Sequence, residues 1–200
     1  QGLNDLQHRG PDDEGTENFN VKTGQLVLGH KRLSIIDLSN NGKQPMKSFD
    51  GRYTIIFNGE IYNYLELKED LKKIGHTFHT DTDTEVLLQY WIRYGLDSLK
   101  KFEGMFAFAI FDQLKETLTL VRDAFGIKPI FYTVKENSFY FSSEILPLLK
   151  LSKHKFEFNY QRSYDYLINS IQDSGSDTFI KNIFHLPPAH YLQFNLNSFK

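Results

Sequence analysis

The stretch with the clearest chemical potential is Asn58-Gly-Glu-Ile-Tyr-Asn-Tyr64, which directly follows the apolar run Tyr53–Phe57. A strand that delivers Asn58 and Gly59 at its end can place a side-chain amide donor beside a main-chain N–H. Such a pair stabilises the negative oxygen that develops during acyl transfer. Asn-Gly is also the commonest two-residue hairpin turn, and taken alone the stretch favours a turn. Only neighbouring motifs can decide between the two interpretations.

Three charged residues could hold the two ends of a free amino acid such as glutamine. Arg32, at the head of the run Arg32–Ile36, offers a planar cation for an α-carboxylate, a bond worth about 1.5–3 kcal/mol. A surface arginine paired with a carboxylate is the commoner arrangement. Asp83 could accept the α-ammonium, although an aspartate just before a helix is more often a cap. Glu60 could contact the same ammonium, yet an exposed loop glutamate needs no function.

Other kinds of site find little support in the sequence. His76 and His79 follow a glycine into a polar loop and do not indicate a metal site. No Gly-x-Ser-x-Gly elbow or Gly-rich phosphate loop occurs, so neither a serine hydrolase nor a nucleotide-binding protein is predicted. The net charge of −2 comes without a basic stripe, which argues against nucleic-acid binding.

The chain shows no mark of a membrane or secreted protein. No apolar run approaches the roughly 20 residues that span a bilayer, and no signal-peptide pattern begins the sequence. The absence of cysteine excludes disulfides and is compatible with the cytoplasm, which is the expected location. The 200 residues and their evenly spread apolar positions predict one large domain, with many aromatic residues in its core.

The elements that must position the candidate residues are short strands and two helices. Capping-box spacing at Asn63 and Glu66, and again at Thr82 and Glu85, predicts helix starts before apolar stripes. Residues 1–20 are polar and rich in turn formers, which indicates an irregular path. The expected strands cover residues 25–30, 32–37, 53–57, 105–111, 117–121, 129–134, 138–141 and 190–195, and the expected helices cover 63–74, 84–94, 143–150 and 160–171.

The strand Met105–Phe111 is apolar on both faces, so both faces must be covered. Hairpin-linked strands with helices inserted in pairs indicate antiparallel sheets with helical layers outside. The predicted fold class is therefore α+β.

Eight motifs occur in one fixed order, and together they resemble the glutaminase (class II glutamine amidotransferase) domain of glutamine-hydrolysing asparagine synthetases. The resemblance covers nearly all 200 residues. The motifs are His8–Gly15, Gly29–Asp37, Gln44–Met46, Asn58–Asn63, Asp81–Val86, Gly104–Ile110, Arg122–Pro129 and Ser142–Ile145.

The resemblance implies a four-layer αββα sandwich of the N-terminal-nucleophile hydrolases. It implies that Arg32 to Ile36 bind glutamine, with Arg32 on the carboxylate. Asn58 and Gly59 would be the catalytic oxyanion donors and would contact the substrate. Glu60 would lie beside the substrate, and Asp83 would hold the ammonium, which overturns the cap interpretation.

One feature departs from the family pattern: the nucleophile there is an N-terminal cysteine, and this sequence contains none. The favoured explanation is that residues 1–200 form an amidotransferase domain truncated at its N-terminus, which alone is inactive. The rival is a nucleophile-less module that binds glutamine or a partner. The closing motif, Leu186–His190, carries Ala189 where the family has glycine, so a positive φ there would strain the alanine.

The full protein is expected to release ammonia from glutamine for ATP-dependent amidation of aspartate. Its synthetase domain, absent here, would use ATP and Mg and would be the partner in the same chain. This fragment is expected to need no cofactor and no metal. An amidotransferase with a different ammonia acceptor stays open, as does the oligomeric state, a homodimer included.

Overall fold

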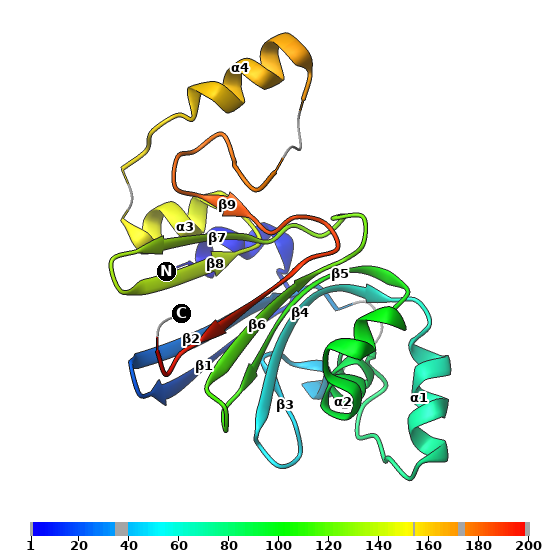
Figure 1. Cartoon of the computed structure of the whole chain (residues 1–200). Helices are drawn as coiled ribbons and strands as arrows, with labels where there is room; N and C mark the ends of the chain where they lie inside the picture. The colour runs from blue at the N-terminus through cyan, green and yellow to red at the C-terminus, as the bar shows by residue number, and fades with distance from the viewer. Residues whose placement is uncertain (1, 35–39, 154, 172–174, 199–200) are drawn as a thin grey trace.

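The computed structural model describes residues 2–34, 40–153, 155–171 and 175–198 (Figure 1). The strands form three antiparallel sheets in the orders β1-β2, β10-β6-β5-β4-β3 and β8-β7-β9. The strands are β1 (Asp13–Val21), β2 (Gly24–Arg32), β3 (Met46–Lys47), β4 (Tyr53–Ile61), β5 (Gly104–Asp112), β6 (Thr117–Arg122), β7 (Phe131–Lys135), β8 (Ser138–Ser142), β9 (Phe184–His185) and β10 (Tyr191–Asn195). The helices are α1 (Tyr64–Lys73), α2 (Asp83–Tyr94), α3 (Ile145–Ser152) and α4 (Tyr160–Asn169), with 3-10 turns η1 (Asn4–Arg9), η2 (Asn40–Gly42) and η3 (Gly95–Lys100).

The layers follow from which faces are apolar. Helices α1 and α2 cover one face of the five-stranded sheet, and the β1–β2 hairpin and β8 cover the other (Figure 1). Helix α3 packs outside β7 and β8. The order helix, sheet, sheet, helix matches the predicted sandwich of antiparallel sheets.

Strand β5 shows why the sandwich has two layers of strands. Phe106 and Phe108 belong to the core under α1 and α2, whereas Ala107, Ala109 and Phe111 belong to the core between the sheets. Both sets are almost completely buried. The prediction that this strand is covered on both faces is confirmed.

The two predicted helix starts are formed differently. At α2 the Thr82 hydroxyl accepts a hydrogen bond from the Glu85 N–H at 3.2 Å, as the capping box predicts. At α1 the Asn63 side chain makes no cap bond. It bonds instead to the Lys101 carbonyl and the Glu103 N–H, so it ties the helix start to the start of β5.

The N-terminal region was predicted wrongly. Residues 13–21, expected to be irregular, form the nine-residue strand β1, which pairs with β2 along its whole length. Phe19 is the one buried residue of β1, and the sequence of the strand lacks the alternation of apolar and polar residues that would predict it. The two short strands expected at residues 25–30 and 32–37 are one strand through Arg32, and residues 35–37 lie outside the described part.

Strand β4 continues through Asn58 and Gly59 to Ile61, so the Asn-Gly pair is not a hairpin turn. Gly59 has φ +152°, and a Cβ there would collide with the Met105 carbonyl oxygen of β5. Only glycine fits this conformation and this close approach. The strand therefore carries Asn58 to the position that the site requires.

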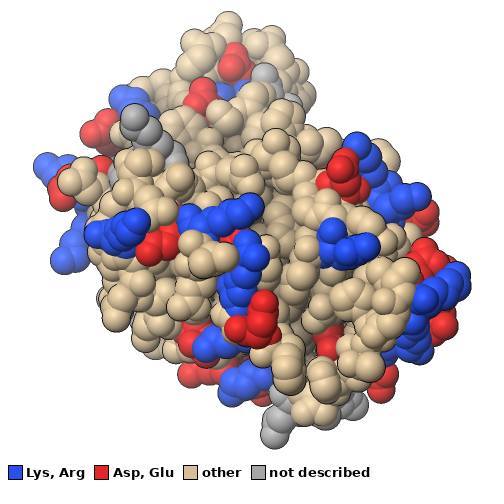
Figure 2. All heavy atoms as spheres, turned by 60° about the horizontal axis from the view of Figure 1, so that its bottom comes forward, with Lys and Arg blue, Asp and Glu red and all other residues tan. Residues whose placement is uncertain are grey.

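The outer surface has two features, a helix apart from the sheets and a mixture of charges. Helix α4 stands away from the sheets (Figure 1), and Figure 2 shows acidic and basic residues interspersed on the face it views. Among the described residues, no helix is long and apolar enough to cross a membrane.

Candidate functional site

The site begins with an open edge of the central sheet. Strand β3 pairs with β4 only at Ile55 and Thr54, so in the described part of the chain β4 has no neighbouring strand beyond Ile55 on that side. On the other side, Phe106 of β5 directs its N–H and C=O to Asp123, away from its partner Gly59. Because backbone directions alternate along an antiparallel strand, Phe57, Gly59 and Ile61 all point their N–H groups at the open edge.

Two of these three N–H groups are occupied by side chains. The Phe57 N–H donates to the Gln44 amide oxygen at 2.6 Å, and the Ile61 N–H donates to an Asp83 carboxylate oxygen at 3.0 Å. The Gly59 N–H between them has no hydrogen-bond partner among the described residues. The edge therefore presents one unpaired main-chain donor.

A second unpaired donor lies on the neighbouring residue. The Asn58 side-chain nitrogen is buried and has no hydrogen-bond partner in the described part of the chain. A buried unpaired donor costs about 1–3 kcal/mol, so proteins seldom leave two in one place. An amide N–H and a main-chain N–H left unpaired on adjacent residues are what an oxyanion hole needs.

Arg32 is buried and comes from β2, whose inward face also carries Leu28. A Cβ on Gly42 would collide with the Arg32 guanidinium and would lie 3.0 Å from the Thr82 methyl carbon. The guanidinium and the residue before Asp83 therefore face the same point of the η2 backbone. Glycine at residue 42 allows this approach.

Two carboxylates lie close together beside the open edge. Asp83 is the first residue of α2 and is 5% exposed, and α2 packs against β4. Burial raises the pKa of Asp83 to about 6, the negative charge of Glu60 adds to the rise, and the Ile61 N–H opposes it. Neither carboxylate has an ion-pair partner among the described residues. A cation placed here would relieve both.

The predicted motifs are bonded to one another around this edge. The Asp12 carboxylate accepts the Ser34 N–H at 2.8 Å, which holds the chain directly after Arg32. The Glu144 carboxylate lies 2.8 Å from His8 and 3.0 Å from Arg9. The first motif is thus connected both to the arginine segment and to the Ser142–Ile145 motif.

A cavity of about 690 Å³ lies between the five-stranded sheet and the strands that cover it, and Asn58 is one of its lining residues. Its lining is mostly apolar and comes from β2, β4, β5 and β8, together with the first residues described. The lining includes Leu3, Leu26, Ile56, Ala107, Ile130 and Phe141. Asn58 therefore stands between this cavity and the open edge of β4.

The structure thus places five of the six predicted site residues around one strand edge. Arg32 reaches it from β2, Asp83 from α2, and Asn58, Gly59 and Glu60 belong to β4 itself. Ile36, the sixth, lies outside the described residues. The described residues contain no group of three acidic or histidine side chains that could hold a metal ion.

Sequence reasoning missed two residues at the same edge. Gln44 binds the Phe57 N–H, and the His30 ring nitrogen Nε2 lies 3.0 Å from the Phe57 carbonyl oxygen. Both belong to motifs of the family resemblance, Gln44–Met46 and Gly29–Asp37, but neither was assigned a role. Their inclusion in those motifs was the available signal.

Comparison with known proteins shows the family of this chain. A family model described as a glutamine amidotransferase domain matches residues 1–200. The chain is 39% identical to a putative glutamine-hydrolysing asparagine synthetase 2 of Methanocaldococcus jannaschii, over 96% of this chain and 40% of that protein. It is 48% identical to the glutamine-hydrolysing asparagine synthetase 1 of Bacillus subtilis, over 70% of this chain and 21% of that protein. The chain spans less than half the length of both relatives.

A solved structure shares the fold. Glutamine phosphoribosylpyrophosphate amidotransferase of B. subtilis, complexed with ADP and GMP, superposes with a TM-score of 0.64. The match covers 78% of this chain and 41% of that one at 21% identity. It supports the α+β sandwich of antiparallel sheets.

Proposed function

This chain belongs to the glutamine amidotransferase domain family, and we propose that its β4 edge binds glutamine and stabilises the oxyanion formed when the side-chain amide is cleaved. The observation that carries the proposal is the pair of unpaired donors on adjacent residues, the Asn58 amide and the Gly59 N–H. A site for a free amino acid lies around them.

The charged groups match the two ends of glutamine. The Arg32 guanidinium would hold the α-carboxylate, and the Asp83 carboxylate, with Glu60 beside it, would hold the α-ammonium. Arg32 and Asp83 are both buried, so each of their hydrogen bonds to glutamine would be stronger than the same bond on the surface. The side-chain amide of the bound glutamine would then extend along the β4 edge to Asn58 and Gly59.

The nucleophile is proposed to come from a segment that precedes Gln1 and carries an N-terminal cysteine. The thiolate would attack the amide carbon, and the free α-amine of the cysteine would take up the thiol proton and pass it to the leaving ammonia. Water would then hydrolyse the thioester to glutamate. The cavity beside Asn58 gives such a segment a place between the sheets.

We also propose that the ammonia is used in the same polypeptide. The relatives named as asparagine synthetases extend well beyond the matched segment. A synthetase domain there would use ATP and Mg to activate aspartate for amidation. The acceptor is the part of the proposal that this domain leaves open.

The test compares two polypeptides. One is this 200-residue chain, and the other, called the extended chain, adds the N-terminal cysteine-bearing segment of a relative. The extended chain should release ammonia from glutamine, and the 200-residue chain should not. A folded extended chain that binds glutamine without hydrolysing it would show a binding module instead.

Variants of the extended chain separate the roles. Asn58→Ala should lower kcat by about 10²–10³-fold, because it removes one oxyanion donor. Arg32→Ala should mainly raise the KM for glutamine, because it removes a contact made equally in the ground state. Equal and negligible effects of both substitutions would place the pocket elsewhere.

A further inference from the structure

The peptide group before Asn58 is held in an unusual way. Phe57 lies on the open edge of β4, where a neighbouring strand would normally take its N–H and its C=O. Two side chains do so instead: the Gln44 amide oxygen accepts the N–H, and the His30 ring donates to the carbonyl. Both sides of the Phe57 residue are therefore fixed by groups from other segments.

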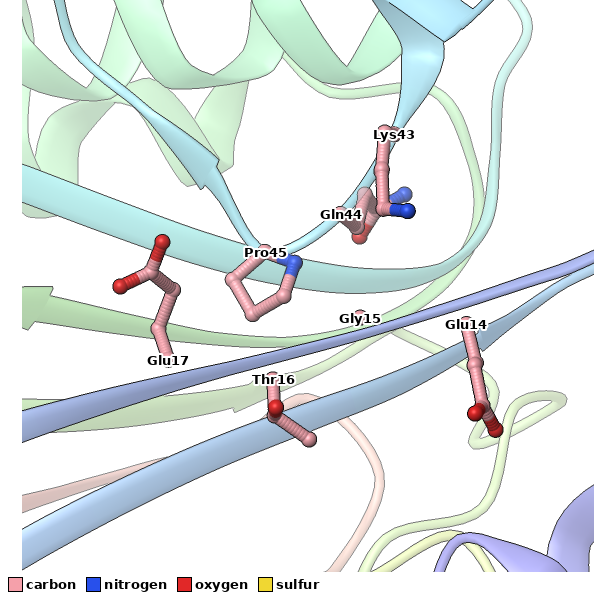
Figure 3. Close-up of a pocket in the computed structure, with 7 residues that line it drawn as sticks. All are labelled: Glu14, Gly15, Thr16, Glu17, Lys43, Gln44 and Pro45. Atoms are coloured by element: carbon pink, nitrogen blue, oxygen red, sulfur yellow. The ribbon is translucent and has the colours of Figure 1, made fainter.

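Gln44 is itself held firmly. It is buried, and its amide nitrogen donates to the Thr84 hydroxyl of α2 at 3.4 Å. Figure 3 shows the segment Lys43–Pro45 lying beside β1, and a Cβ on Gly15 of that strand would collide with the Gln44 carbonyl oxygen. The backbone on both sides of this contact leaves Gln44 little room to move.

The His30 ring is in one defined state. The Phe57 carbonyl can only accept, so the ring nitrogen Nε2 must carry the proton. Burial lowers the pKa of His30 to about 4, the positive charge of Arg32 also lowers it, and the Phe57 carbonyl opposes this. The ring is therefore neutral at pH 7, and it lines the same cavity as Asn58.

We propose that Gln44 and His30 are positioning residues that fix the Phe57 peptide groups and thereby aim the Asn58 amide and the Gly59 N–H at one point. The inference rests on the proposed function and extends it to two residues that do not touch the substrate. A misplacement of about 1 Å at a reacting centre can cost about 10²-fold in rate. Among the described residues, the next side chain that holds this edge of β4 is Asp83, which accepts the Ile61 N–H four residues further along.

The experiment uses the extended chain with Gln44→Met and His30→Phe, which remove the hydrogen bonds and keep the side-chain volume close to the original. Each should lower kcat about 10–100-fold and leave the KM for glutamine within about threefold. His30→Gln, whose amide can still donate to the Phe57 carbonyl, should recover most of the lost kcat. The matched control is Gln193→Met, which removes the bond from Gln193 of β10 to the Thr119 hydroxyl, away from the edge.

The outcomes are distinguishable. A wild-type extended chain without turnover defeats the proposed function and this inference with it. Turnover by the wild type together with unchanged kcat in both variants overturns the inference alone. A parallel loss of kcat, glutamine affinity and thermal stability, not recovered by His30→Gln, would also overturn it, because it would show a merely structural role. A lowered kcat with unchanged KM and unchanged melting temperature supports it.

Discussion

Two buried aspartates in this molecule are treated in opposite ways. Asp123 follows β6 and is completely buried. Its side-chain oxygens accept four main-chain N–H groups, at 3.0–3.2 Å, from Phe106, Phe125, Ile127 and Lys128. Burial alone would raise the pKa of Asp123, but these donors hold it below the usual value.

Asp83 is nearly as buried but much less well supported. Its carboxylate accepts the Ile61 N–H, the N–H groups of Thr84 and of Asp83 itself also favour the charged form, and the negative charge of Glu60 opposes it. Burial raises the pKa of Asp83 to about 6. The chain thus completes the surroundings of one carboxylate and leaves those of the other incomplete.

The difference is the one expected between a structural carboxylate and the binding role proposed for Asp83. A buried carboxylate that is fully hydrogen-bonded by its own chain stabilises the loop around it. A buried carboxylate without a cation favours whatever cation can reach it, and the free energy it costs when empty is recovered on binding. The motif Arg122–Pro129 therefore builds the fold, whereas Asp81–Val86 carries the carboxylate that we propose binds the substrate.

Loss of the Asp123 carboxylate should destabilise the chain more than any other substitution considered below. Asp123→Ala leaves four main-chain donors without a partner and should lower the free energy of unfolding by about 3–5 kcal/mol. Urea unfolding followed by circular dichroism measures this. A loss below about 1 kcal/mol would mean that the loop does not depend on the carboxylate.

Asp83→Asn should raise the free energy of unfolding near neutral pH, whereas Asp123→Ala lowers it. The raised folded pKa means that Asp83 favours the folded state below pH 3.8 and that this contribution is lost as the pH rises through about 6. At pH 8 the asparagine variant should be more stable by about 1–3 kcal/mol, and the gain should vanish near pH 4. The same substitution in the extended chain should raise the KM for glutamine at least about tenfold. A destabilised variant with normal KM would contradict the binding role.

The pH dependence of glutamine use should sharpen the same point. Glutamine keeps its ammonium through this range, whereas Asp83 becomes protonated as the pH falls through about 6. The affinity for glutamine of the extended chain with its cysteine changed to alanine should therefore fall about tenfold for each pH unit well below 6. Asp83→Asn should remove this acid limb. A limb that persists in the variant would assign it to another group.

The smallest effect is expected beside the Asp123 loop. Ala189 donates its N–H to the Asp123 carbonyl oxygen and has φ +59°, the strained conformation anticipated where the family has glycine. Ala189→Gly should therefore stabilise the chain by about 0.5–1 kcal/mol in thermal unfolding. The matched control is Ala124→Gly. Ala124 is exposed and lacks a positive φ, so this substitution should lose stability instead.

The sequence predicts the apolar elements of this fold well and the polar ones badly. The strand at residues 105–111 is a continuous apolar run, and the two helices that cover the five-stranded sheet carry clear periodic patterns. Strand β1 does not, because pairing with β2 holds it in place while only Phe19 is buried. Pairing between strands is a long-range property, and a local pattern cannot reveal it.

The site was predictable only in part for the same reason. Arg32, Asn58 and Asp83 carry chemistry that the motifs point to. Gln44 and His30 act on the main chain of a distant strand, and no local spacing shows that contact. The Asn63 side chain likewise does not cap α1. It bonds instead to the main chain of Lys101, just before β5.

We propose that the incompletely paired carboxylate of Asp83 receives the ammonium of glutamine. This can be tested by carbon-13 NMR of the Asp83 carboxyl group, in the extended chain with its cysteine changed to alanine so that glutamine is not consumed. Without ligand the carboxyl should titrate with a pKa of about 6, and saturating glutamine should lower that pKa below its usual value. A titration that is the same with and without bound glutamine would contradict the account.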